Sequence, residues 1–456
     1  MEGTASSLEE EVARLRQELA HERKLRQQLE QQLSTFKQEP LRPHQPEERK
    51  DTKRGGLADV RVLDLSRVLA GPYCSMLLAD MGADVLKLEV PRLGDDSRQY
   101  PPFVKDVSLY YVNLNRGKRS MTLNLKHEEG KRIFLELVRQ SDVLLENFSP
   151  GTMERLGLGY EALKAVKPDL VYASISGFGQ TGPYRSRPGY DIISQAMSGL
   201  MSVTGWPETP PTRAGTAVGD VMGALFTCIG ILSALHVRNR TGEGQLVDVA
   251  LIDSLFASLG QHLQKYFVEG DLPTRIGNRY EFIYPYDSFR AADGWVIIAI
   301  ANDSLWARFV EATDPKSCSL DGMSPKLNAE EFTSNPKRLL QASTLKELLE
   351  EWTSRHSVQS IVSLLVQQRI PACPIASLND VVNDEHIAKA REMVVKLEQP
   401  ELGTVQLMGN PMKMSLTSPK PQGPAPSLGQ HTHEILQELL GLSESDLQRL
   451  KENQII

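Results

Sequence analysis

Cysteine is scarce in this chain, which has four cysteines among 456 residues. Cys74, Cys228, Cys318 and Cys373 lie far apart, with no CxxC pair and no histidine beside them. This spacing predicts neither a zinc site nor a disulfide framework. We therefore expect a reducing environment.

Long apolar runs and the common nucleotide-binding motifs are also missing. No apolar run approaches the roughly 20 residues that a transmembrane helix needs, so we expect a soluble protein without a membrane partner. Neither GxxxxGK[ST] nor a GxGxxG after the first predicted strand occurs. The sequence therefore predicts no phosphate-binding loop of either kind.

Acidic residues outnumber basic ones, 58 against 51, which gives a formal net charge of −7. This charge opposes general nucleic-acid binding, although a local basic pocket for a phosphorylated ligand stays open. The length exceeds that of one usual domain, so we expect two domains, or one large α/β domain with an excursion.

The N-terminal 37 residues predict a charged helix. Leu8, Val12, Leu15 and Leu19 follow the alternating spacing of four and three residues that is typical of a coiled coil, but polar residues interrupt the pattern afterwards. A weak coiled coil and a solvated helix without a partner explain this pattern equally well. Residues 38–56, rich in proline and charge, predict a linker.

From residue 57 onward, short apolar strands alternate with segments of helical spacing. Strands are expected at 60–65, 83–90, 120–125, 142–148 and 170–179, and helices at 71–82, 126–140 and 151–165. Strand-then-helix segments follow at 247–267 and 293–313, and a helical stretch at 343–369. The alternation predicts an α/β fold with a doubly wound parallel sheet. Ligands of such sheets bind beyond the carboxyl ends of the strands, so we expect chemistry at 68–72, 147–148 and 177–191.

Asp220 follows Gly219 at the start of an apolar helix expected from about Val221 to Arg238. Its position alone favours a carboxylate that caps the helix. In a second interpretation, the helix end and the glycine-flanked loop keep the carboxylate ionised and reachable. A carboxylate held against an activated carbonyl can act as a nucleophile, and the glycine beside it would let a bulky substrate approach.

Six segments appear in an order typical of one family. They are RVLAGPYCSMLLADMGADVLKLEVPRLGDDSR, NLNRGKRSMTLNLK, SDVLLENFSPGTMERLGLGYEAL, SGFGQTGPYRSRPGYDIISQAMSGLMSVTG, AGTAVGDVMGALFTCIGILSALHVRNRTGEGQLVDVAL and LGQHTHEIL. From about residue 57 to the C-terminus the chain resembles the class III CoA-transferases, which include formyl-CoA transferase, carnitine CoA-transferase and succinyl-CoA:glutarate CoA-transferase.

The resemblance implies that Asp220 is the catalytic carboxylate. It also implies a set of residues that contact coenzyme A, which are Leu69, Ala70, Leu123, Lys126, Asn147, Phe148, Arg155, Pro188, Gly189, Tyr190 and Asp191. Lys126 and Arg155 suit phosphate oxygens, although solvated helix charges explain both without the resemblance. Asp191 and Asp303 are candidate supporting carboxylates, and a helix N-cap is the favoured interpretation of Asp303.

The implied reaction moves CoA from an acyl-CoA donor, such as succinyl-CoA, to a carboxylic or dicarboxylic acid through an aspartyl-CoA thioester on Asp220. The CoA thioester is then a substrate rather than a cofactor, and the implied mechanism requires no metal and no permanently bound cofactor. Leu69 stands where formyl-CoA transferase has a glutamine, and residues 277–294 hold no counterpart of that enzyme's glycine-rich loop. These departures weaken formyl or oxalyl substrates and favour the succinyl-CoA and dicarboxylate branch.

Two alternatives stay open. The α-methylacyl-CoA racemases look similar over the first half of the body but use a histidine where this chain has Tyr190. A tyrosine with an ordinary pKa near ~10 is a poor base at neutral pH, so transfer is favoured over racemisation. A non-catalytic scaffold joined to a coiled coil is the second alternative, which an intact Gly219-Asp220 step opposes.

The resemblance also implies a domain organisation and a partner. A large domain formed by 57–267 and 375–456 would enclose a smaller domain at 268–374, and two chains would form an interlocked homodimer. The acid-rich N-terminal segment does not look like a transit peptide, so the sequence favours the cytoplasm. The mitochondrial matrix is the alternative that the family suggests.

Overall fold

The computed structural model describes Arg16, Ala20 and residues 55–316, 318–323 and 325–456. Apart from those two isolated positions, the predicted helix at 1–37 lies outside the described residues, as does nearly all of the predicted linker at 38–56. The chain forms two compact units. The first runs to Ser198 and also contains Thr216–Ser258 and Glu392–Ile456, and the second contains Gly199–Gly215 and Leu259–Arg391. The predicted domain ranges stay predictions.

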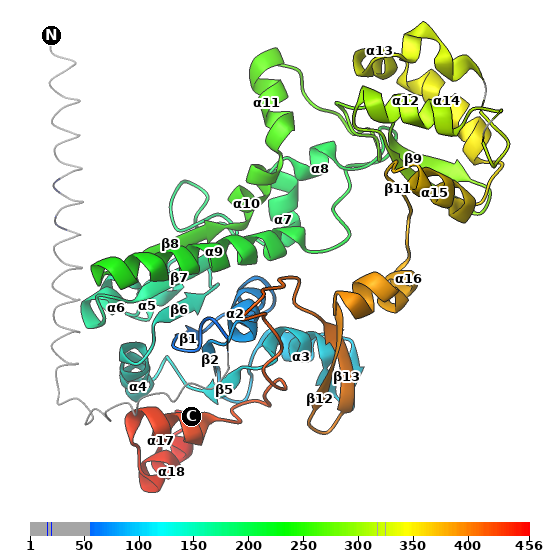
Figure 1. Ribbon diagram of the computed structural model, residues 1–456. Helices are drawn as coiled ribbons and strands as arrows, with labels where there is room; N and C mark the ends of the chain where they lie inside the picture. The colour runs from blue at the N-terminus through cyan, green and yellow to red at the C-terminus, as the bar shows by residue number, and fades with distance from the viewer. Residues whose placement is uncertain (1–15, 17–19, 21–54, 317, 324) are drawn as a thin grey trace, which may run out of the picture. The chain divides into compact units, whose positions relative to one another are not determined.

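A six-stranded sheet forms the centre of the first unit (Figure 1). Its strands, in spatial order, are β5 (Arg119–Thr122), β2 (Asp84–Glu89), β1 (Arg61–Asp64), β6 (Val143–Glu146), β7 (Val171–Ser176) and β8 (Leu246–Ala250). All neighbours pair in parallel. The chain runs outward in one direction from β1 and in the other from β6, which confirms the predicted doubly wound sheet.

Helices cover both faces of this sheet. On one face α2 (Ala70–Asp80) and α9 (Val218–Thr241) pack on residues such as Val62 and Val85. On the other face Leu63 and Leu86 meet α4 (Glu128–Arg139), α6 (Tyr160–Val166), α17 (Thr432–Leu440) and α18 (Glu444–Glu452). Adjacent strand residues therefore enter opposite cores, which explains why the strands are apolar on both sides.

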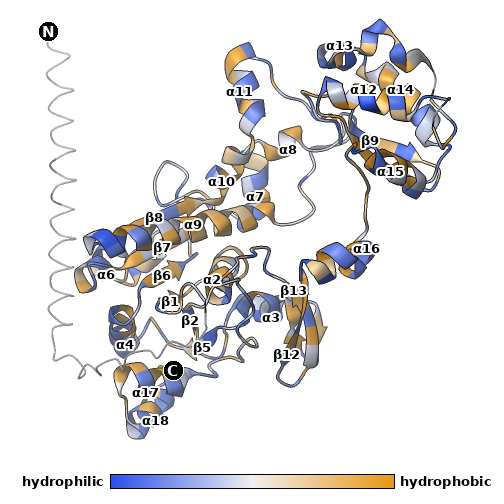
Figure 2. Cartoon of the chain, in the orientation of Figure 1, coloured by the Kyte–Doolittle hydropathy of each residue, from blue (hydrophilic) through white to orange (hydrophobic). Residues whose placement is uncertain are grey.

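Helix α9 is apolar along most of its 24 residues (Figure 2). Its most apolar window has a mean hydropathy of 1.9, so by length and composition it could cross a membrane. The expectation that no apolar run approaches that length is therefore wrong for this helix. Core helices of globular proteins pass the same test, and Ala224, Ile231 and Leu235 of α9 are buried against the sheet.

The remaining elements of the first unit are short. They are η1 (Asp96–Gln99), β3 (Phe103–Val104), β4 (Val107–Ser108), α3 (Leu109–Asn115), α5 (Thr152–Arg155), α7 (Asp191–Met197), α10 (Leu251–Ser258), β12 (Val394–Gln399) and β13 (Gly403–Met408). The single helix predicted at 151–165 is wrong, because Gly157 adopts a φ of 76° between α5 and α6. The β12–β13 hairpin packs through Val405 and Leu407 on Tyr111 of α3.

The second unit is built on an antiparallel sheet in the order β11 (Ala372–Pro374), β10 (Gly294–Ala299) and β9 (Tyr286–Ala291). Its helices are α8 (Leu200–Val203), α11 (Gly260–Glu269), α12 (Asp303–Ala312), η2 (Pro325–Asn328), η3 (Glu330–Phe332), α13 (Asn335–Leu340), α14 (Ala342–Thr353), α15 (Val358–Gln367), α16 (Leu378–Asn383) and η4 (Glu385–Ala390). Phe309 and Trp352 pack edge to face in its core. The helical stretch predicted at 343–369 is two helices, since Ser357 caps the second.

Asp303 does not cap α12, contrary to the favoured interpretation. The N-cap is Asn302, whose side-chain oxygen accepts a hydrogen bond from the Leu305 N–H at 2.9 Å. Asp303 instead forms an ion pair of 2.7 Å with the buried guanidinium of Arg338. Asn302 is the cap because its backbone is extended and it lies one residue before the helix, the position that a capping side chain occupies.

Candidate active site

The two central strands of the parallel sheet, β1 and β6, mark the point at which the strand order reverses. Ligands of doubly wound sheets bind in the crevice beyond the carboxyl ends of such a pair. The turns that follow these strands are joined by Asn147. Its side-chain oxygen accepts the Arg67 N–H and its side-chain nitrogen donates to the Arg67 carbonyl, each at 2.8 Å.

Two of the predicted CoA contacts, Asn147 and Phe148, lie directly after β6. The Phe148 N–H donates to the buried carboxyl of Glu146 at 2.6 Å, and the Arg67 guanidinium lies 5.4 Å from the Phe148 ring centroid. Leu69 is half-buried and Ala70 buried at the start of α2. The structure therefore brings the residues predicted at 69–70 and 147–148 to one edge of the sheet.

Leu123 and the two predicted phosphate contacts differ in exposure. The Leu123 side chain is buried in the core, so only its main chain can meet a ligand. Lys126 and Arg155 are exposed, and Arg155 donates to the Thr152 hydroxyl at 2.8 Å. Both cationic heads are thus within reach of solvent, as phosphate binding requires.

The segment Pro188–Asp191 leads into α7. Gly189 lies so close to Gly177 that a Cβ at residue 177 would be 2.8 Å from the Gly189 Cα. Tyr190 is 79% exposed. Asp191 is the first residue of α7 and points its carboxylate at another helix.

Asp191 supplies the hydrogen-bond acceptor at the N-terminus of α9. One of its oxygens accepts the Gly219 N–H at 2.7 Å and the Asp220 N–H at 3.4 Å. A Cβ on Gly219 would lie 2.9 Å from that oxygen, which explains the glycine at this position. The N-cap residue is Ala217, and Asp220 lies in the first turn. Asp220 is therefore not the helix cap, because a carboxylate 29 residues earlier takes that role.

The Asp220 carboxylate is not held in the ionised form by the helix end, contrary to expectation. Burial and the negative charge of Asp191 raise the pKa of Asp220 to about 7. Within the part of the chain that the structure describes, its oxygens accept no hydrogen bond. The helix N–H groups that would favour the charged form donate to Asp191 instead.

Tyr110 of α3 is a neighbour of Asp220 that the sequence did not single out. Burial, then the charge of Asp220, raises the pKa of Tyr110 to about 12. The Tyr110 ring meets that of Tyr100 edge to face, with centroids 5.8 Å apart. Its hydroxyl is therefore protonated at neutral pH and can donate a hydrogen bond near the carboxylate. No local pattern separates it from the adjacent Tyr111, which is buried.

The described residues contain no group of three or more His, Cys, Asp or Glu side chains that could hold a metal ion. The four cysteines are free thiols.

Comparison with known proteins assigns this geometry to a family. Residues 57–432 match the family model described as CoA-transferase family III. Over 394 residues the chain is 43% identical to succinyl-CoA:mesaconate CoA-transferase of Haloarcula marismortui. This alignment covers 84% of the chain described here and 96% of the relative. The chain is 41% identical over 363 residues to acetyl-CoA:oxalate CoA-transferase of Acetobacter aceti, with 79% and 90% covered.

A solved structure agrees with these two relatives. The crystal structure of a CAIB/BAIF family protein from Brucella suis matches with a TM-score of 0.72 at 36% identity, and it covers 85% of this chain and 100% of that chain. The protein described here therefore belongs to CoA-transferase family III, and the two relatives named above are CoA-transferases.

Proposed function

We propose that Asp220 is the nucleophile of a CoA transfer from an acyl-CoA donor to a carboxylic acid. The observation that carries this proposal is the state of its carboxylate, which is partly buried, accepts no hydrogen bond among the described residues and lies in the first turn of α9. Asp191 fixes the backbone of that turn through the N–H groups of Gly219 and Asp220. An aspartate with a purely structural role would accept hydrogen bonds through its carboxylate oxygens. Those of Asp220 accept none among the described residues and are therefore available to a substrate.

The reaction follows as four acyl exchanges on one carboxylate. An Asp220 oxygen attacks the donor thioester, the C–S bond breaks, and a mixed anhydride forms with release of CoA thiolate. The thiolate attacks the aspartyl carbonyl, which expels the donor acid and leaves an aspartyl-CoA thioester. The acceptor carboxylate attacks that thioester and releases the thiolate again. The thiolate then attacks the acyl carbonyl of the acceptor in the new anhydride, which frees Asp220 and the new acyl-CoA.

Each tetrahedral intermediate places a negative charge on a carbonyl oxygen close to residue 220. Tyr110 supports this step, because a phenol whose pKa is raised to about 12 keeps its proton and can donate it in a hydrogen bond to that oxygen. The main-chain N–H groups at the start of α2, next to Leu69 and Ala70, are the proposed contacts for the thioester arm of CoA. Lys126 and Arg155 are the proposed contacts for its phosphates.

The proposed donor is succinyl-CoA and the proposed acceptor a dicarboxylic acid. This choice is supported by the similarity to the mesaconate enzyme and by Leu69 in place of the glutamine of formyl-CoA transferase. The similarity to an acetyl-CoA:oxalate enzyme favours a different donor and a shorter diacid. Both pairs therefore belong in the substrate panel.

A homodimer is the proposed assembly. Two packed helices of the first unit expose large apolar side chains, including Ile192 and Met197 of α7 and Phe226 and Ile229 of α9. Ile229 is 62% exposed. Apolar groups in this number on two adjacent helices are typical of a surface that another protein chain covers.

The test is covalent trapping. The full chain is incubated with succinyl-CoA or acetyl-CoA, quenched with hydroxylamine, digested and analysed by mass spectrometry. We expect a hydroxamate on Asp220, none in Asp220→Ala, and an unchanged yield in Asp253→Asn, whose carboxylate is exposed on α10.

Three other outcomes would contradict the proposal. Absence of an adduct with every donor would exclude the covalent route. Deuterium entering the α-carbon of a 2-methylacyl-CoA without CoA exchange would identify a racemase. CoA binding without either reaction would identify a scaffold.

A further inference from the structure

The turn between β1 and α2 has a backbone conformation that its own sequence disfavours. Val68 has a φ of +69°, in the left-handed region. A β-branched residue is rarely found there, because its Cβ substituents crowd the backbone, and such conformations persist only where surrounding contacts enforce them. The residues that enforce it here come from β2 and from the loop after it.

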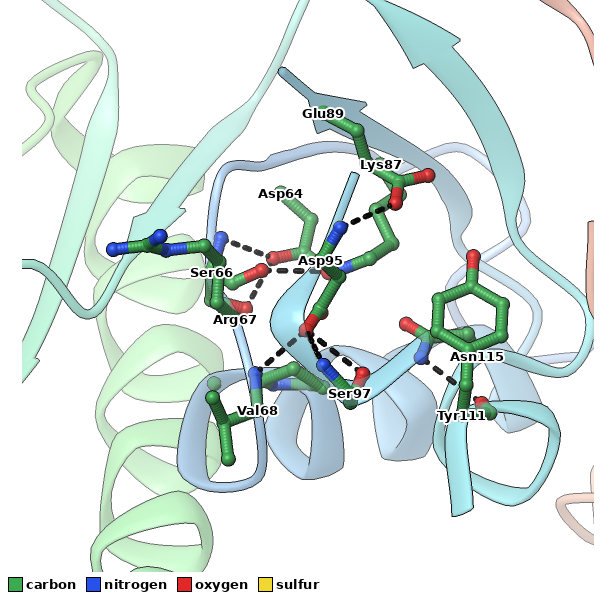
Figure 3. Close-up of polar contacts among 12 residues, drawn as sticks. Asp64, Ser66, Arg67, Val68, Lys87, Glu89, Asp95, Ser97, Tyr111 and Asn115 are labelled. Carbon is green, nitrogen blue, oxygen red and sulfur yellow. Dashed lines mark hydrogen bonds and ion pairs between the residues drawn. The ribbon is translucent and has the colours of Figure 1, made fainter. Parts of the chain in front are cut away.

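Asp95 and Lys87 hold the two sides of this turn (Figure 3). One Asp95 oxygen accepts the Val68 N–H at 3.1 Å and also the N–H and hydroxyl of Ser97, each at 2.8 Å. The other oxygen pairs with the Lys87 ammonium at 2.8 Å. The same ammonium donates to the Ser66 carbonyl at 2.8 Å. A single ion pair thus fixes the turn on both sides of Arg67.

A second buried pair supports the first. Asp64 accepts the Ser66 N–H at 2.9 Å and also the Ser66 hydroxyl, and it pairs with Lys118 at 3.2 Å. The side chains of both pairs are 0% exposed. Burial opposes the charge on Asp95, but Lys87 and the two hydrogen bonds from Ser97 together outweigh this effect and lower the pKa of Asp95.

Burying two ion pairs is an inefficient way to stabilise a fold, because the desolvation of the charges offsets most of their attraction. Apolar residues of similar size would fill the same space. The Lys87–Asp95 pair instead fixes specific backbone groups, because Asp95 accepts the Val68 N–H and Lys87 donates to the Ser66 carbonyl. The location of this pair under the turn that leads to Leu69 and Ala70 therefore points to a role in shaping that turn.

We propose that Asp95, held by Lys87, is a positioning residue that keeps Val68 left-handed so that the start of α2 is ready to receive the CoA thioester. This inference rests on the proposed function. Without the Asp95 acceptor, Val68 returns to a negative φ, and the main chain at residues 69–70 leaves the geometry that the ligand needs. CoA binding is then weakened, whereas the chemistry at Asp220, on a different helix, proceeds once the substrate is bound.

The test measures the dissociation constant for CoA by calorimetry, and KM and kcat for the acyl-CoA donor, in the full chain. Asparagine has one acceptor oxygen, which can face either the Lys87 ammonium or the Val68 N–H but not both. For Asp95→Asn we therefore expect affinity for CoA and donor to fall about tenfold, the effect of one hydrogen bond to a charged group, with kcat within roughly threefold of wild type. The matched control is Asp80→Asn, which breaks an equally buried pair with Arg116 (2.7 Å) at the other end of α2. It should destabilise the protein without changing KM.

Rescue separates positioning from a general loss of stability. Glycine adopts a positive φ without the steric cost, so adding Val68→Gly to Asp95→Asn should recover most of the lost affinity. A merely structural Asp95 would show no such recovery.

Two results would overturn the inference: a folded Asp95→Asn with wild-type CoA affinity, or a double variant no better than the single one. If Asp95→Asn does not fold, Asp95→Glu keeps the charge beside Lys87 and moves only the acceptor oxygen. A wild-type KM in that variant would also refute the inference. The two failures can be told apart. A wild-type protein that neither binds CoA nor forms an adduct on Asp220 refutes the proposed function and this inference with it, whereas wild-type CoA affinity in Asp95→Asn refutes the inference only.

Discussion

Replacing Asp191 with asparagine should make the enzyme more active at acidic pH. The reaction needs the Asp220 carboxylate in its ionised form, and its pKa is raised from 3.8 to about 7 by burial and, second, by Asp191. The rate constant kcat/KM should therefore rise with pH through about 7 in the wild type. An asparagine at 191 keeps an oxygen to accept the Gly219 N–H, now at 2.7 Å, but carries no charge.

The size of the change follows from the order of the two causes. The whole rise is about three pH units, and Asp191 is the smaller cause. Its removal should therefore move the acidic limb of the profile to lower pH by less than about 1.5, which corresponds to at most about 2 kcal/mol. Burial remains, so the limb should stay well above the pH at which an exposed aspartate titrates.

The assay is kcat/KM for the acyl-CoA donor between pH 5 and 9 in wild type, Asp191→Asn and Asp253→Asn. The last variant removes an exposed carboxylate of the same unit that does not influence Asp220, so its limb should coincide with that of the wild type. A wild-type limb near pH 4, or a limb in Asp191→Asn that stays in place or moves to higher pH, would refute the electrostatic reasoning.

Three further predictions concern other parts of the site. Asp220→Asn should raise the free energy of unfolding, by at most about 4 kcal/mol at pH 8 and by less at pH 5. The sign follows because the Asp220 carboxyl has a higher pKa in the folded state than in the unfolded state, so its ionisation increasingly opposes folding as the pH rises. Denaturant unfolding at the two pH values measures the gain in stability, and equal gains at both would contradict the prediction. Tyr110→Phe should lower kcat about tenfold with little change in the KM of the donor, because only the transition state accepts the hydrogen bond of the Tyr110 hydroxyl. Steady-state kinetics measures both constants, and a change confined to KM would show a role in binding instead. Ile229→Glu should convert a dimer into a monomer in sedimentation or light scattering, because a charge would be buried in the apolar surface of α9; an unchanged mass would place the interface elsewhere.

Periodicity predicted the sheet because it is a local property of the chain. Segments such as 60–65 and 83–90 carry apolar residues on both faces, which fits strands that helices cover on both sides. Helix boundaries were predicted less well where the backbone conformation of a single residue ends a helix. Gly157 interrupts the helix expected at 151–165, and a glycine in a helical pattern does not reveal its φ.

The electrostatics of the site could not be predicted from local patterns. Gly219-Asp220 looks like a capping step, and the sequence near it does not show that Asp191, 28 residues before the glycine, takes the helix N–H groups. That contact reverses the expected effect of the helix end on Asp220. Tyr110 is brought to the site only by the packing of α3.

One signal of the buried network was present in the sequence. Lys87 stands between Leu86 and Leu88 in the strand segment ADVLKLEV, and a lysine inside a buried parallel strand requires a charged partner. The partner itself, Asp95, lies in an irregular loop eight residues later. A strand pattern alone therefore indicates that an ion pair exists but not which backbone conformation it enforces.

The first unit cannot be completed until late in synthesis, because a side chain made early needs a partner near the end of the chain. The guanidinium of Arg116, paired with Asp80 in the core, also donates to the Met408 carbonyl at 2.8 Å, 292 residues later in the chain. At roughly 5–20 residues per second, synthesis takes about 15 to 60 s to supply that acceptor. During this time the parallel sheet can pair, but its buried charges lack their last partner. The nascent protein should therefore need protection by chaperones until its C-terminal segment is released.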